Sequence, residues 1–264
     1  MTVSKVKAIE KRFNVQASQP ELYTPNTNVS HGQHAPVVAS DKPGELQFFQ
    51  FGFTPFWAKK QFYMVNARSE GDFNKEDDPQ YTGSMGIVNK PMFRQSIRSK
   101  RCLVVADAFI EGPKKEKLDK PHVVYLKDGE RPFALAGIWD EWVNKESGEV
   151  VHSFAIITTV SNDLMDRIGH HRSPVVLDRN QEAAWLDPNL ELAEVTGMLG
   201  PYDARKMNAY PIAPTIKNPR ANGISLLEPI GQRLYPEYKY ELFSEIKMFG
   251  MGETAGEVQD RASC

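Results

Sequence analysis

The sequence predicts an α+β fold built on a mostly antiparallel, barrel-like sheet with peripheral helices. Apolar runs of strand length dominate the chain, and turn dipeptides such as Asp128-Gly129 and Ser147-Gly148 separate some of them. No regular alternation of strands with crossover helices is visible, which argues against a parallel α/β sheet. The expected strands are 46–57 (ending in a turn), 102–111, 121–126, 133–143, 152–161 and 174–177.

Short helices are expected around this sheet. Residues 3–13 place apolar side chains near one face and lysines on the other, and residues 93–101 have the composition of a basic helix. Asn162 is suited to cap a helix that follows it. Two further helices are expected at 180–186 and 190–199, an extended connection at 17–44 and a surface loop at 71–91.

One domain over residues 1–230 and a variable C-terminal tail over 231–264 are expected. The chain has 264 residues, of which 41% are hydrophobic and 25% charged, as is ordinary for a folded globular protein. No apolar run approaches the roughly 18 to 20 residues of a membrane span, and the first residues are too charged for a secretory signal. We therefore expect a cytoplasmic protein without membrane contact.

Charge and cysteine content exclude several kinds of site. The net charge of −2 gives no global basic field, so nucleic acid would have to bind through a local patch. The two cysteines are Cys102, inside an apolar run, and Cys264, the last residue. This pair gives no disulfide framework and no zinc ribbon. We expect neither a metal nor another cofactor.

Two positions have the residue types of proton transfer. Glu111 ends the apolar run 102–111, where burial would raise the pKa of a carboxyl group and suit it to act as an acid or base. His170 and His171 follow a predicted helix, and histidine titrates near neutral pH. Because vicinal side chains point in different directions, at most one of them is expected in a given site. An ordinary surface glutamate and ordinary loop histidines are the simpler alternatives.

Two further segments have the residue types of a nucleic-acid site. Asn66 offers a donor and an acceptor, and Arg68 can bind a phosphate with two hydrogen bonds. Trp57 stands beside Phe56 and two lysines, the mixture of aromatic and cationic groups that a single-strand surface needs. Polar loop residues and core aromatics next to solvated charges are the alternatives.

Six segments occur in a diagnostic order: FGFTPFW, VNARSE, FRQSIRSKRCLVVADAFIEG, FALAGIWDEW, SFAIITT and HHRSPVVL. In this order and spacing, from about residue 46 to residue 230, the chain resembles the SOS-response-associated peptidase (SRAP) family of abasic-site processing proteins. The resemblance implies covalent capture of abasic sites in single-stranded DNA. In that family the initiator Met is removed, the exposed α-amine of a cysteine condenses with the sugar aldehyde, and its thiol closes a thiazolidine ring.

The resemblance also implies roles for single residues. Glu111 corresponds to the catalytic glutamate, His170 to a histidine that transfers protons to and from the sugar, and Asn66 to an asparagine that positions the N-terminal residue. Contacts with DNA phosphates and bases are implied for Arg68, Arg172, Pro55 and Trp57. The implied partner is single-stranded DNA with abasic sites, met by a monomer without a small-molecule cofactor.

The sequence departs from the family at the residue that attacks the sugar, because position 2 is Thr2 and no cysteine precedes Cys102. Either Met1 is an internal methionine of a protein that begins upstream with Met-Cys, or the protein is a degenerate paralogue that binds single-stranded DNA without a covalent bond. We favour the first explanation because the three implied catalytic residues persist. For the chain as printed, we expect reversible DNA binding with little durable crosslinking, so that the lyase-like and autopeptidase activities are reduced or absent.

A peptidase that acts on other proteins is the third alternative. We rank it last, because the sequence shows no Ser-His-Asp or Cys-His arrangement placed to cut an external substrate. The only cleavage that the implied chemistry requires is release of the initiator Met.

Overall fold

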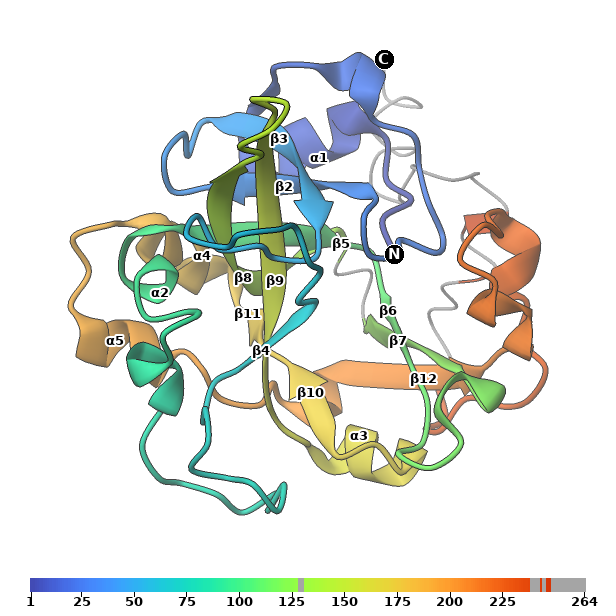
Figure 1. Ribbon diagram of the computed structural model, residues 1–264. Helices are drawn as coiled ribbons and strands as arrows, with labels where there is room; N and C mark the ends of the chain where they lie inside the picture. The colour runs from blue at the N-terminus through green and yellow to red at the C-terminus, as the bar shows by residue number, and fades with distance from the viewer. Residues whose placement is uncertain (128–130, 238–242, 244–245, 248–264) are drawn as a thin grey trace.

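The computed structural model describes residues 1–127, 131–237, 243 and 246–247 (Figure 1). Its larger sheet has nine strands, and five of them close a ring in the order β3, β2, β5, β8, β9 and back to β3. These strands are β2 His34–Ala39, β3 Glu45–Phe51, β5 Arg101–Ala106, β8 Phe133–Val143 and β9 Val150–Val160. Within the ring the β3–β9 pairing is parallel and the other four are antiparallel. The predicted barrel-like, mostly antiparallel sheet is confirmed.

The wall of this barrel is apolar on both faces. Along β5, Leu103 and Val105 join one buried cluster, whereas Cys102 and Val104 join another. This is the alternation that the two-residue period of a strand imposes. Helix α4 (Arg179–Leu186) covers the first face, and its Trp185 indole donates a hydrogen bond of 3.0 Å to the Cys102 carbonyl. Helices therefore cover the barrel from outside, as the sequence predicts.

Four short strands extend the large sheet, and two of them reach the site described below. Strand β4 (Asn66–Arg68) runs parallel to β9, and β10 (Arg172–Pro174) runs antiparallel to the same strand. The other two are β1 (Gln16–Ala17) and β11 (Val176–Leu177), on β3 and β8.

A second sheet of three strands lies beside the barrel: β6 (Phe109–Glu111), β7 (His122–Leu126) and β12 (Met207–Pro211). The prediction of one strand over 102–111 is therefore wrong, because the chain passes from β5 to β6 at Asp107. This aspartate is buried, and its carboxylate accepts hydrogen bonds from the backbone N–H groups of Val3 and Ser4 at 2.6 and 2.8 Å. The N-terminal segment thus fixes the point at which the chain changes sheets.

The same contacts correct the first predicted helix. Because Val3 and Ser4 are bound to the Asp107 carboxylate and Lys5 is the extended N-cap, helix α1 begins at Val6 and ends at Phe13. The basic helix expected at 93–101 is also shorter, since α2 spans Ser96–Ser99. Arg101 is fully buried and is the first residue of β5. Its guanidinium donates hydrogen bonds to backbone carbonyls of α2 and to the Trp185 carbonyl near the end of α4.

The remaining predicted helices are confirmed. Helix α3 spans Asp163–Ile168, and the Asn162 side chain accepts a hydrogen bond of 3.0 Å from the Met165 N–H, as an N-cap does. Helix α5 spans Leu192–Gly197. Short 3-10 turns lie at Pro20–Leu22, Gly86–Asn89, Lys117–Asp119, Ala204–Lys206, Pro214–Lys217 and Ile224–Leu227.

Two predicted segments remain to be compared with the structure, the extended connection at 17–44 and the C-terminal tail at 231–264. The connection expected at 17–44 contains β2, an inner strand of the barrel, which the sequence hides because Pro36 and polar residues interrupt the pattern. Most of the tail at 231–264, and the turn expected at 128–129, lie outside the described residues. In the part of the chain that is described, no helix is long and apolar enough to span a membrane.

Candidate active site

Three strand ends and the loop before β10 meet at one pocket of about 320 Å³. Strand β4 contributes Asn66 and Arg68, and the end of β6 contributes Glu111. The pocket is lined by Asn66, Arg68, Phe109, Glu111, Leu135, Ile156, Thr158, His170, His171, Arg172, Ser173 and Pro174. Five of the seven residues to which the sequence assigned a role therefore line a single pocket, although up to about a hundred residues separate them along the chain.

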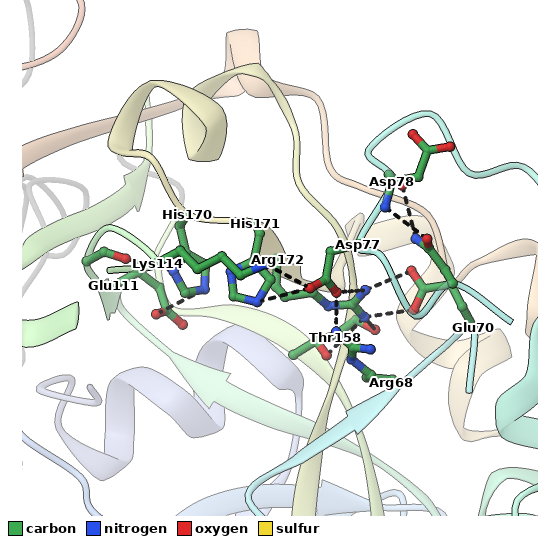
Figure 2. Close-up of polar contacts among 12 residues, drawn as sticks. Arg68, Glu70, Asp77, Asp78, Glu111, Lys114, Thr158, His170, His171 and Arg172 are labelled. Atoms are coloured by element: carbon green, nitrogen blue, oxygen red, sulfur yellow. Dashed lines mark hydrogen bonds and ion pairs between the residues drawn. The ribbon is translucent and has the colours of Figure 1, made fainter. Parts of the chain in front are cut away.

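Glu111 and His170 face each other in this pocket (Figure 2). The Nε2 atom of His170 lies 3.5 Å from a carboxylate oxygen of Glu111. Burial raises the pKa of Glu111, and the nearby imidazole partly opposes that rise. Glu111 therefore retains its proton to a higher pH than an exposed glutamate does.

The tautomer of His170 follows from its second contact. Its Nδ1 atom lies 2.7 Å from the backbone carbonyl oxygen of Gly112. A carbonyl can only accept a hydrogen bond, so Nδ1 carries the proton and donates it. In the neutral ring Nε2 is then the basic nitrogen, and it faces Glu111.

Gly112 is needed for this arrangement because another turn packs directly against it. A Cβ atom at this position would lie 1.8 Å from the carbonyl oxygen of Lys117, closer than any two such atoms can approach. A larger side chain at this position would therefore not fit the turn. Nothing in the local sequence pattern singles out Gly112 as a site residue.

Asn66 and Arg68 enter the pocket from β4. They are two residues apart on a strand, so their side chains share one face. Asn66 is exposed, and within the described chain its amide group makes no hydrogen bond, so it is free to bind a ligand. The Arg68 guanidinium is partly exposed and is ion-paired with Asp77.

Arg172 is held by its neighbours more tightly than a phosphate-binding role requires. Its guanidinium is nearly buried and donates to both carboxylate oxygens of Glu70, at 3.2 and 2.7 Å, and to the Thr158 carbonyl at 2.9 Å. Glu70 is itself 1% exposed. This bidentate ion pair forms part of the pocket wall. Arg172 can contact a ligand only through the part of its side chain that lines the pocket.

His171 corrects the expectation that only one of the vicinal histidines enters the site. Both line the pocket, with ring centroids 5.0 Å apart. His170 faces Glu111, whereas His171 Nε2 lies 3.6 Å from Asp77 (Figure 2). Their side chains do point in different directions, but both line the pocket.

Pro55 and Trp57 do not line the pocket. Pro55 is buried and shapes its turn from inside, while Trp57 is 51% exposed beside the equally exposed Phe56. The turn is fixed to the barrel, since the Phe56 N–H donates 2.9 Å to the Asp140 carboxylate and the Trp142 indole donates 2.8 Å to the Ala58 carbonyl. It presents two aromatic side chains on a rigid base.

The first residues are anchored at the far end of β6 from Glu111. The Met1 amine donates 3.0 Å to the Ala108 carbonyl, and burial lowers the pKa of this amine to about 6, against an opposing effect of Asp107. Thr2 is 3% exposed, and its hydroxyl donates 2.8 Å to the Val105 carbonyl. Ala108 directly precedes β6 and is three positions from Glu111, which is about 10 Å of extended chain. Neither Met1 nor Thr2 lines the pocket.

No group of three or more His, Cys, Asp or Glu side chains among the described residues is arranged to hold a metal ion. Cys102 is fully buried in the barrel wall, and burial raises the pKa of its thiol.

A comparison with protein families shows to which family the chain belongs. The family described as SOS response associated peptidase (SRAP) matches residues 1–219. This chain belongs to the SRAP family. Among characterised SRAP relatives, the abasic site processing protein YoqW of Bacillus subtilis is 33% identical over 227 residues, which cover 83% of this chain and 93% of YoqW. The abasic site processing protein HMCES of Xenopus tropicalis is 24% identical and covers 79% of this chain and 67% of its own length.

Solved structures show the same fold. A protein from Bacteroides thetaiotaomicron superposes with a TM-score of 0.68 at 29% identity, over 86% of this chain and 97% of its own. A protein from Bordetella bronchiseptica superposes with a TM-score of 0.63 at 20% identity, over 80% of this chain and 97% of its own. The fold of this chain therefore recurs in solved structures over most of its length.

Proposed function

We propose that this SRAP protein processes abasic sites in single-stranded DNA, and that the pocket around Glu111, His170 and Asn66 receives the abasic sugar. The observation that carries the proposal is the meeting of these three side chains in one pocket of about 320 Å³. A carboxylic acid and an imidazole can transfer protons at a sugar, and a free amide can hold a ligand by hydrogen bonds. The names of the relatives YoqW and HMCES support the same substrate.

The acid–base pair fits the opening of the sugar ring. An abasic deoxyribose is a cyclic hemiacetal, and its C1′–O4′ bond must break to release the aldehyde. In our proposal the basic Nε2 of His170 takes the proton of the C1′ hydroxyl, while protonated Glu111 gives its proton to O4′. The products are an aldehyde at C1′ and a hydroxyl at C4′, with every proton accounted for. The raised pKa of Glu111 keeps the acid available at higher pH.

The DNA strand would approach along the side of β4. Arg68 is the most accessible cation that lines the pocket and is assigned to a backbone phosphate. Trp57, with Phe56, is assigned to base stacking, which contributes about 1–3 kcal/mol per base. Arg172 is assigned mainly a structural role in the pocket wall, because its guanidinium already donates two hydrogen bonds to Glu70. Phosphate binding is its secondary assignment.

A covalent step in this proposal needs an amine that condenses with the aldehyde and releases water. The resemblance assigns that role to the α-amine of an N-terminal cysteine, whose thiol then closes the ring, after self-removal of the initiator Met. Position 2 here is Thr2. Its hydroxyl would close an oxazolidine, which hydrolyses more readily than the sulfur ring, so for the printed chain we propose reversible capture with little durable crosslink.

A second candidate function is a binding module for single-stranded DNA that makes no covalent bond. The hydrogen bonds that hold Thr2 against Val105, away from the pocket lining, favour it. Intact mass spectrometry separates the two functions. The protein is incubated with an abasic single strand, with and without a borohydride reductant that fixes a Schiff base. A DNA-sized mass gain that requires the reductant supports reversible capture, and DNA binding without any mass gain supports the binding module. An abundant adduct stable to heat without reductant would contradict both.

A further inference from the structure

One carboxylate sits where a ligand anion would be expected. Asp77 comes from the 71–91 loop, yet its side chain is only 10% exposed, and it faces the rim of the pocket (Figure 2). It is ion-paired with Arg68, and its other oxygen lies 3.2 Å from the Lys114 amine and 3.6 Å from His171 Nε2. Arg172 lies 4.0 Å away. Four groups that are or can become cationic thus surround one acidic side chain.

The loop turns this one acid inward and leaves its neighbours outside. Glu76 and Asp78 are exposed, although both carry the same charge as Asp77. The turn is made locally, because Asn74 accepts 2.9 Å from the Asp78 N–H and donates 3.0 Å to the Asp78 carbonyl. Asp77 takes a φ of +57°, the left-handed region that an aspartate tolerates at some cost. The backbone conformation that places this carboxylate among the cations is therefore energetically unfavourable for the loop by itself.

Several groups at the rim of the pocket share the single negative charge of Asp77. Glu70 already satisfies Arg172 with two hydrogen bonds. Arg68, Lys114 and His171 remain, and Asp77 is the carboxylate that they share. A phosphodiester carries the same single negative charge as a carboxylate and more acceptor oxygens. Exchange of one for the other would conserve the charge of the site.

We propose that Asp77 holds the place of a DNA backbone phosphate in the free protein, and that Lys114 and His171 join Arg68 in binding that phosphate when Asp77 withdraws. The inference rests on the proposed function, since it names the phosphate that flanks the abasic sugar. It assigns to Asp77 an autoinhibitory role and to Lys114 and His171 a binding role. Because Asp77 competes with DNA for the same cations, the loop lowers the apparent affinity of the free protein for any single strand.

Removing the charge of Asp77 tests the competition. Binding of a fluorescent single strand without an abasic site is measured for the wild type, Asp77→Asn and Asp72→Asn. Asp72 is the matched control, because it lies in the same loop, changes the charge by the same amount and pairs with Lys90 in solvent. We expect Asp77→Asn to bind about fivefold tighter or more, within the usual range of coupling between two sites, and Asp72→Asn to change less than twofold. Equal effects of the two substitutions, or weaker binding by Asp77→Asn, would overturn the inference.

A second variant tests the cations and does not depend on the folding of the first. Lys114→Gln should lower the slope of log affinity against log salt by about 0.7, the value for one phosphate on a single strand. Lys115→Gln, at an exposed neighbour with the same charge, should leave the slope unchanged. Equal slopes for these two variants would overturn the role of Lys114. If the wild type binds no single strand at low salt, the proposed function itself fails; if it binds and the variants do not differ from their controls, only this inference fails.

Discussion

His170 donates its Nδ1 proton to the carbonyl oxygen of Gly112 at 2.7 Å, and this contact fixes which nitrogen of the ring faces Glu111. The carbonyl belongs to the residue directly after Glu111, so one short turn positions both members of the proposed acid–base pair. The strand end that carries Glu111 also orients the His170 ring. The geometry therefore depends on the turn that follows β6 as much as on the two side chains.

Replacing Gly112 should separate this positioning effect from general loss of stability. In Gly112→Ala the new Cβ would overlap the Lys117 carbonyl, so the turn must shift and the His170 hydrogen bond must lengthen. We expect the rate of aldehyde release from an abasic strand to fall about tenfold or more, as loss of an oriented base does, with little change in DNA affinity. Gly200→Ala, where nothing lies within 4 Å, is the control. Equal rates in the two variants would show that the turn does not orient His170.

The raised pKa of Glu111 makes stability depend on pH. The folded protein holds this proton more tightly than the unfolded chain, so the contribution is fully present below the unfolded pKa of about 4.3 and is lost as pH rises through the higher folded pKa. Glu111→Gln removes the dependence. We expect the free energy of unfolding of Glu111→Gln, relative to the wild type, to increase from pH 4 to pH 8 in urea titrations.

Glu116→Gln is the control for that titration, because the pKa of Glu116 is lowered by its own backbone and by Lys120. Its relative stability should not increase with pH. A flat or falling difference for Glu111→Gln would mean that Glu111 is not desolvated in solution.

The buried pair of Glu70 and Arg172 should carry a large share of the local stability. Glu70→Gln removes the bidentate charge partner of a nearly buried guanidinium and leaves it only the more distant Asp77 at 4.0 Å, and removal of one partner of a buried pair costs about 3–5 kcal/mol. Glu70→Gln combined with Arg172→Met should recover part of this loss, because no unpaired charge remains. Urea unfolding of the single and double variants checks both statements. A loss under about 1 kcal/mol in the single variant would show that water already reaches the pair.

Much of the fold was predictable because the barrel strands are long, apolar and locally marked. The strand predicted at 133–143 coincides with β8, and the helix after Asn162 begins at its cap. The break between β5 and β6 was not predictable, since it depends on Asp107 binding residues about a hundred positions earlier. No local pattern in the run 102–111 records that contact.

The residues of the candidate site were likewise predictable only in part. The motifs that the chain shares with the SRAP family pointed to Glu111, His170 and Asn66, and all three line one pocket. Glu70 stands in the same motif as Asn66 and Arg68, so its sequence position was a signal. Asp77 had none, because three consecutive acids occupy its loop and only the folded turn decides which one faces the cations. Tertiary contacts, rather than residue type, select the residue.

Opening of the abasic sugar by the pocket, as proposed here, can be measured without reference to the N-terminal residue. An abasic single strand is mixed with protein and a small alkoxyamine, which traps the released aldehyde as an oxime, and oxime formation on the DNA is followed by mass spectrometry. We expect the wild type to accelerate trapping over DNA alone, and Glu111→Gln to lose about a hundredfold of that acceleration while binding the strand as tightly. Trapping no faster with the wild type than with DNA alone, under conditions where the protein is bound, would contradict the proposal.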